Sequence, residues 1–142
     1  TPTNAAPVDP QASSAITPPT EPFIEAKTAF EAGNYADAAA ALILLIDANT
    51  LGAEEAEGFF LLGSALLRTE EFGASVQALA QGLRRFPDSP FAAPSLVNLA
   101  DALTGNGQRD EACRLLSFVA IEYPGQAQAI SDAQDRATAF GC

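Results

Sequence analysis

Apolar residues recur at helical spacing along most of the chain, in segments separated by short polar or glycine-containing stretches. Within each segment they return every three or four positions, which places them on one face of a helix. The long alternation of apolar and polar residues that is typical of strands is absent from the sequence. The pattern predicts seven helices, over about 22–32, 35–48, 53–69, 72–86, 91–104, 109–123 and 127–140.

Residues near the ends of these segments support the boundaries. Pro22 suits the first turn of a helix, where a missing N–H group costs no hydrogen bond. Gly33 follows the same helix and is a common stop signal. In the third segment Glu54, Glu55 and Glu57 gather at the helix start, where carboxylates complement the positive end of the helix dipole. We expect these three side chains to face solvent.

The helices repeat in pairs, with a step of 37 residues. A small residue at Ala38, Ser75 and Ala112 is followed four positions later by leucine in each copy, and proline closes two copies at Pro87 and Pro124. A fixed period in the thirties indicates stacked helical hairpins, each burying its apolar face against the next. We therefore predict an all-α solenoid of helix-turn-helix repeats with a capping helix. The repeats span about 22–52, 53–89 and 90–125, and the cap spans 126–142.

The first 21 residues differ from the rest of the chain. They are rich in proline, threonine and alanine and carry no apolar periodicity, so they cannot bury enough surface to offset their ordering entropy. We expect residues 1–21 to form a flexible linker. We also expect such a linker to follow a further part of the full protein.

Charge and composition exclude several functions. The net charge of −11 disfavours nucleic acid and anionic membranes, whose binding needs lysine and arginine patches. No apolar run is long enough for membrane insertion. Histidine is absent, which removes the usual general base and the commonest metal ligand. Adjacent carboxylates such as Asp110 and Glu111 lie at helix starts rather than across a cleft. We predict neither an enzyme nor a cofactor.

Two cysteines are present, Cys113 in the third repeat and Cys142 as the last residue. Without histidine they cannot build an ordinary zinc site. One interpretation is a disulfide that ties the C-terminal end to the last repeat, which an exported protein would permit. The other is two free thiols.

The residues of the second repeat match the spacing of the tetratricopeptide (TPR) signature, and those of the third repeat match it again. The first repeat is weaker, because its closing proline is missing. The physical basis is close helix contact, since small residues such as Gly63 and Ser75 let the two helices of a repeat approach each other. The chain therefore resembles TPR proteins. The matching residues of the second repeat are Phe59, Leu62, Gly63, Leu66, Phe72, Ser75, Leu79, Gly82 and Pro87.

The phrases FPDSPFAA, DEAC and EYPG further resemble the C-terminal domain of the CpoB/YbgF family, periplasmic proteins encoded with the Tol-Pal system. The resemblance implies a periplasmic adaptor that binds a TolA-like protein and a peptidoglycan synthase, and that coordinates cell-wall synthesis with outer-membrane constriction in cell division. It also favours the disulfide. It implies an upstream coiled coil that trimerises the full-length protein, whereas we expect the present chain to be monomeric. The alternative is a structural TPR factor of another envelope machine, for outer-membrane insertion or for pilus or secretion assembly.

In TPR proteins the first helix of each pair lines a concave face, where an extended peptide or a helix lies. The resemblance thus predicts a mixed apolar and polar groove. The alternative is that several of its aromatic residues pack between neighbouring helices. The basic clamp of chaperone-binding TPR domains has no counterpart at the required spacing. The predicted groove residues are Phe23, Lys27, Phe30 and Glu31 in the first repeat, Phe60, Ser64, Leu67 and Arg68 in the second, and Val97, Asn98, Asp101 and Thr104 in the third.

Overall fold

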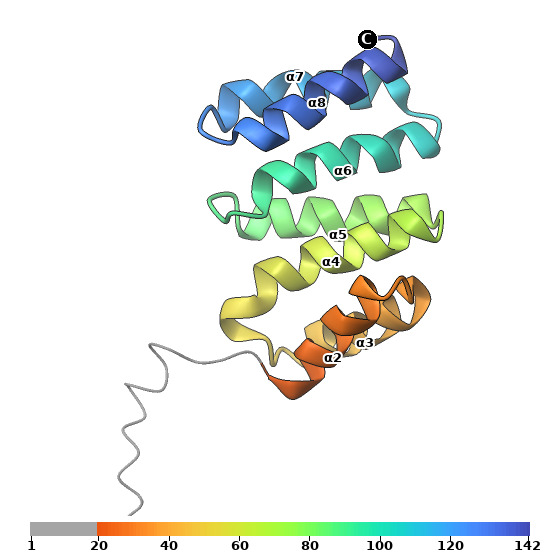
Figure 1. Ribbon diagram of the computed structural model, residues 1–142, viewed down its shortest axis with the longest axis vertical. Coiled ribbons are helices and arrows are strands. Elements are labelled where there is room, and N and C mark those ends of the chain that lie inside the picture. Colours follow the sequence, from red (N-terminus) through yellow and green to blue (C-terminus); the bar gives the residue numbers. More distant parts are fainter. Residues whose placement is uncertain (1–19) are drawn as a thin grey trace, which may run out of the picture.

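The computed structural model describes residues 20–142, and the regular structure in this range is entirely helical (Figure 1). The seven α-helices of this range confirm the predicted ones, with ends that differ by no more than two residues. The predicted linker over 1–21 lies almost wholly outside the described residues. The elements are α2 (Glu21–Glu31), α3 (Tyr35–Asp47), the 3-10 helix η1 (Gly52–Glu54), α4 (Glu55–Arg68), α5 (Phe72–Arg85), α6 (Ala92–Gly105), α7 (Arg109–Glu122) and α8 (Ala127–Phe140).

The helices form hairpins that stack in chain order, with the α2–α3 hairpin at one end and α7 with α8 at the other (Figure 1). Each helix packs against its neighbours in the sequence. The first helices of successive hairpins also contact one another, α2 with α4, α4 with α6, and α6 with α8. This arrangement is a TPR-type helical solenoid, as the repeat pattern predicted.

The close helix contact predicted within the second repeat is present. The hydroxyl of Ser75 donates a hydrogen bond of 2.7 Å to the carbonyl oxygen of Gly63. A Cβ atom at Gly63 would collide with the side chain of Leu79, so only glycine permits this distance between α4 and α5. Leu79 is fully buried and packs with Val97 and Leu116 in the core shared by the later helices.

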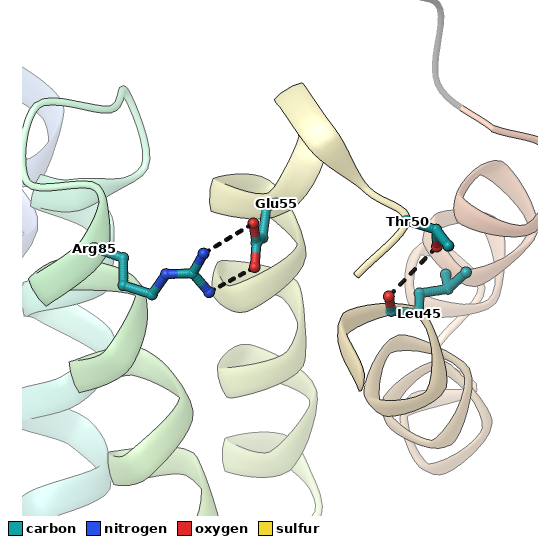
Figure 2. Close-up of polar contacts among 4 residues, drawn as sticks. All are labelled: Leu45, Thr50, Glu55 and Arg85. Carbon is teal, nitrogen blue, oxygen red and sulfur yellow. Dashed lines mark hydrogen bonds and ion pairs between the residues drawn. The ribbon is translucent and has the colours of Figure 1, made fainter. Parts of the chain in front are cut away.

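The acidic start of α4 differs from the prediction. Glu55 is 8% exposed and accepts two hydrogen bonds from Arg85, of 2.6 Å from Nη1 and 3.2 Å from Nη2 (Figure 2). The guanidinium of Arg85 also lies over the rings of Phe59 and Phe86, 5.7 and 5.2 Å from their centroids. The expectation that Glu55 faces solvent is therefore wrong, because the end of α5 reaches back to the start of α4.

A polar contact also closes the turn that leads from the first repeat to the second. The hydroxyl of Thr50 lies 3.5 Å from the carbonyl oxygen of Leu45, to which it donates (Figure 2). In the same turn Asn49 adopts a φ of 56°, a left-handed conformation that asparagine tolerates better than most residues. Thr50 stands where proline closes the later repeats, so side-chain and backbone geometry end this hairpin without proline.

The C-terminal end is fastened by several links. Cys113 of α7 and Cys142 are joined in a disulfide. The guanidinium of Arg109 donates a hydrogen bond of 3.0 Å to the carbonyl oxygen of Phe140 at the end of α8. Gly141 takes a φ of +74°, the left-handed conformation with which helices commonly terminate. The predicted capping helix α8 is thereby held against the last hairpin.

Candidate functional site

The predicted groove residues lie on α2, α4 and α6, the first helices of the three hairpins. Together with α8 these helices contact one another across the repeats and form one continuous surface. We call this surface the first-helix face. Its predicted residues fall into rows, because positions 37 residues apart occupy equivalent places in successive repeats.

The first row is Phe23, Phe60 and Val97, and it belongs mostly to the core. Phe23 is 1% exposed and Val97 is also buried, each within one of the two apolar clusters. Phe60 is partly buried, packs against both clusters, and places its ring 5.5 Å from that of Phe91. The prediction that Phe23 and Val97 face a partner is wrong, because the neighbouring helices cover both side chains.

The second row is Lys27, Ser64 and Asp101, and each member joins its own helix to the next first helix. Lys27 Nζ lies 2.7 Å from a carboxylate oxygen of Glu57, which connects α2 to α4. The hydroxyl of Ser64 accepts a hydrogen bond of 2.9 Å from the amide of Asn98, which connects α4 to α6. The equivalent link from α6 to α8 is made by Asp101. Each of these three polar residues therefore links two helices of the stack, although the Ser64 hydroxyl also donates to the carbonyl oxygen of Phe60 in its own helix.

Both carboxylate oxygens of Asp101 accept a hydrogen bond from Nε of Arg136, each at 3.2 Å. Burial raises the pKa of Asp101 above its ordinary value, against the opposing effect of Arg136. At the other end of the row the hydrogen bond to Glu57 raises the pKa of Lys27, while burial opposes the shift. The two links thus stand in different environments, one partly desolvated and the other open to water.

The third row is Phe30, Leu67 and Thr104. This row and the adjacent Arg68 leave side chains that a partner can reach. Arg68 is exposed, and its guanidinium lies 4.9 Å from the ring centroid of Tyr35. Phe30 meets the same ring edge-on at 5.2 Å. Leu67 is half-buried beside them, whereas the hydroxyl of Thr104 is buried and has no hydrogen-bond partner among the described residues. The accessible side chains here are therefore Leu67 and Arg68.

A hollow of ≈ 220 Å³ continues the accessible surface toward the first repeat. Ile24, at 44% exposure, is its largest exposed apolar side chain. Three glutamates line it, Glu31, Glu54 and Glu57, against the single positive charge of Lys27. The hollow is consequently acidic around an apolar centre, a combination that attracts a basic side chain on an apolar segment.

Sequence reasoning missed the partners of the second row and the role of Ile24. A signal for the partners exists, since Ser64 and Asn98 are 34 residues apart and Asp101 and Arg136 are 35 apart. Both separations are close to the 37-residue step, so each pair lies at nearly equivalent places on successive first helices. No such signal exists for Ile24, because the sequence of one helix does not indicate whether a neighbouring helix covers a given side chain.

The described residues also bear on catalysis and membranes. Between residues 20 and 142 no group of three or more histidine, cysteine or carboxylate side chains is arranged to hold a metal ion. Within the same range, none of the helices combines the length and the hydropathy needed to span a bilayer.

Comparison with known protein families identifies residues 25–90 as matching the tetratricopeptide repeat model. The match runs from α2 to the turn after α5, so it covers the first two hairpins. Comparison with curated proteins gave no match. The first two hairpins are thus similar to TPR repeats, and the helices over residues 20–142 form a TPR-type solenoid. TPR repeats generally serve as scaffolds for protein–protein interaction and not for catalysis, and the solenoid of this chain has the architecture of such a module.

Proposed function

We propose that this chain is a periplasmic interaction module that binds a segment of a partner protein on the first-helix face. The observation that carries the proposal is the accessible surface left after the stack is built. It consists of the acidic hollow around Ile24 and of Leu67 and Arg68 on the next first helix. Both lie on one face and stem from successive repeats, the arrangement in which an extended or helical segment engages a solenoid.

Charge defines the chemistry of the bound segment. The hollow holds three glutamates against one lysine, and the whole chain carries a net charge of −11. A segment with lysine or arginine beside an apolar residue would place the apolar group on Ile24 and the basic group near Glu31 and Glu54. Arg68 would then hold a carboxylate or a backbone carbonyl of the same segment, with Leu67 beneath it.

We further propose a biological context for this module. By its resemblance to CpoB/YbgF proteins, the module would bind a TolA-like protein and a peptidoglycan synthase, and would coordinate peptidoglycan synthesis with Tol-Pal-driven outer-membrane constriction in cell division. The Cys113–Cys142 disulfide supports an oxidising compartment such as the periplasm, where disulfides persist. In this proposal an upstream coiled coil trimerises the full-length protein, while the present chain alone is monomeric.

The test is recovery of the partner from periplasmic extract on the immobilised chain, followed by binding of the purified components. Leu67→Asp and Arg68→Glu are the test variants, because both side chains are accessible. Ile121→Asp is the matched control, since Ile121 is 68% exposed on α7, away from the first-helix face. We expect wild type and control to retain a TolA-like protein and the test variants to bind it about 10-fold more weakly or worse.

Equal binding by Leu67→Asp, Arg68→Glu and wild type would refute the assignment to the first-helix face. Failure of the purified TolA-like protein and of the purified synthase to bind wild type would refute the Tol-Pal context. Sedimentation provides the check on oligomeric state, where a stable trimer of the present chain would contradict the expected monomer.

A further inference from the structure

The outer side of the first hairpin carries a second groove, of ≈ 330 Å³, between α2 and α3. None of its lining residues comes from α4, so it faces away from the rest of the stack. Leu44 of α3 stands at this groove and is 71% exposed, the most exposed large apolar side chain among the described residues. The apolar floor is formed by Pro22, Ala26, Ala29, Ala41, Leu44 and Leu45.

The repeat symmetry shows what kind of element such a groove receives. Adding one 37-residue step turns Ala26, Ala29 and Ala41 into Gly63, Leu66 and Ala78 of the second repeat. Leu66 and Ala78 are buried in the same cluster as Leu42 of α3. In the second repeat the equivalent surface is therefore covered by a helix, namely the second helix of the hairpin before it. In the first repeat no described residue takes that place.

The residues of the groove suit a helix in two ways. Its floor is built largely from alanine, and small side chains let a helix approach closely and pack its own apolar residues into the gap. Its rim is acidic, because Glu25 on α2 and Asp37 on α3 are the charged residues that line it. A helix with an apolar stripe and basic residues beside that stripe is complementary to both features.

Two other occupants fit less well. A second copy of the chain would bring Glu25 and Asp37 against their own counterparts, on molecules that each carry a net charge of −11. The preceding residues 1–19 contain five prolines, a composition that opposes a continuous helix. We propose that the α2–α3 groove binds an amphipathic helix of a partner protein, with lysine or arginine flanking its apolar stripe. This site is separate from the first-helix face and does not depend on the function proposed for that face.

The test uses a labelled synthetic helix of about five turns, with a leucine and alanine stripe flanked by lysines, and a matched peptide flanked by glutamates. Binding to the whole chain is measured by fluorescence anisotropy, and the site is mapped by amide chemical shifts. We expect the lysine-flanked helix to bind and to shift amides around Ala29 and Ala41. Leu44→Lys and the glutamate-flanked peptide should each weaken binding about 10-fold or more.

Ile121→Lys is the matched control, because it places the same charge on an equally exposed apolar position of α7 and should leave binding unchanged. Leu67→Asp should also leave it unchanged, which separates this groove from the first-helix face. Thermal unfolding of Leu44→Lys should match wild type, since the side chain is exposed.

Absence of binding at about 0.5 mM peptide, or equal binding by Leu44→Lys and wild type, overturns the proposal. Amide chemical-shift changes that map to α4 and α6 also overturn the proposal. A dimer in sedimentation that Leu44→Lys dissolves identifies a second copy as the occupant instead. Tighter peptide binding, by about 10-fold, after removal of residues 1–19 identifies that segment as the occupant and likewise overturns the proposal.

Discussion

The two ends of the solenoid differ in how they are closed. At the C-terminal end α8 covers the last hairpin, and it is held by the Cys113–Cys142 disulfide and by the hydrogen bond from Arg109 to the end of the helix. At the N-terminal end the α2–α3 hairpin leaves an alanine-lined groove on its outer side, and Leu44 beside it is largely exposed. One end is covalently fastened, whereas the other offers an apolar surface.

This difference shows that, in a repeat protein, one end can carry the stabilising links and the other end the surfaces available for binding. A solenoid is held together by nearest-neighbour contacts, so its terminal repeats have only one neighbour and need extra fastening or a polar surface. Here the last repeat has the fastening. The first repeat relies on buried apolar contacts such as Phe23 and on a partly exposed ion pair between Lys27 and Glu57. The same end carries both the acidic hollow and the outer groove, so the repeat without a disulfide contributes to both proposed binding surfaces.

The largest effect should come from the buried anchor of the first repeat. Phe23→Ala removes a ring that is almost fully buried and leaves a cavity, so we expect it to lower the free energy of unfolding by about 4 kcal/mol. Phe118→Ala near the other end is the control, because Phe118 is half-exposed and should cost less than about 1 kcal/mol. Urea unfolding followed by circular dichroism provides the comparison. Equal losses for the two variants would show that Phe23 does not anchor the N-terminal repeat.

Removing the disulfide should have the next largest effect, and at the opposite end. The cysteines are 29 residues apart, and opening a loop of this length costs about 3.5 kcal/mol through the entropy of the unfolded chain. Cys113→Ser/Cys142→Ser should therefore speed hydrogen exchange in α8 while the amides of α2 and α3 keep the rates of wild type. Unchanged protection of α8 would mean that packing alone fastens this end.

The smallest effects on stability should come from the Asp101–Arg136 and Lys27–Glu57 links, one in the acid and the other in the alkaline pH range. Folded Asp101 keeps its proton to a higher pH than the unfolded chain, so its contribution to stability falls as the pH rises from about 3.8 through the raised pKa. The raised pKa of Lys27 gives a contribution that is complete below 10.5 and is lost as the pH rises through the folded value. Each contribution should stay below about 1 kcal/mol, because both links are partly exposed.

Unfolding free energies of Asp101→Asn and Lys27→Met, measured against pH, check these signs. The difference between wild type and Asp101→Asn should decrease with rising pH in the acid window. The difference in unfolding free energy between wild type and Lys27→Met should change only in the alkaline window. A wild-type advantage over Asp101→Asn that grew with pH would reverse the assigned effect of burial.

The fold could be predicted closely from the sequence, because local signals mark the helix ends and the repeat step. Examples are Gly33, which follows the first helix, and the small residues Gly63 and Ser75, which let two helices approach each other. The sequence predicted the site less well, since a single helix reveals which residues share a face but not which of them a neighbouring helix covers. Phe23 was therefore assigned to the groove although it is buried. The pairing of Glu55 with Arg85, 30 residues later, depends on how α4 and α5 lie together and has no local signal.

We propose that the TolA-like partner binds the first-helix face, and neither the outer groove of the first hairpin nor the exposed side of α7. The most direct measurement is amide chemical-shift mapping of the isotope-labelled chain titrated with the purified TolA-like protein. We expect the largest shifts at Ile24, Leu67 and Arg68, and we expect them to be lost with Arg68→Glu. Shifts confined to Leu44 and the outer groove, or to the exposed residues of α7, would contradict it.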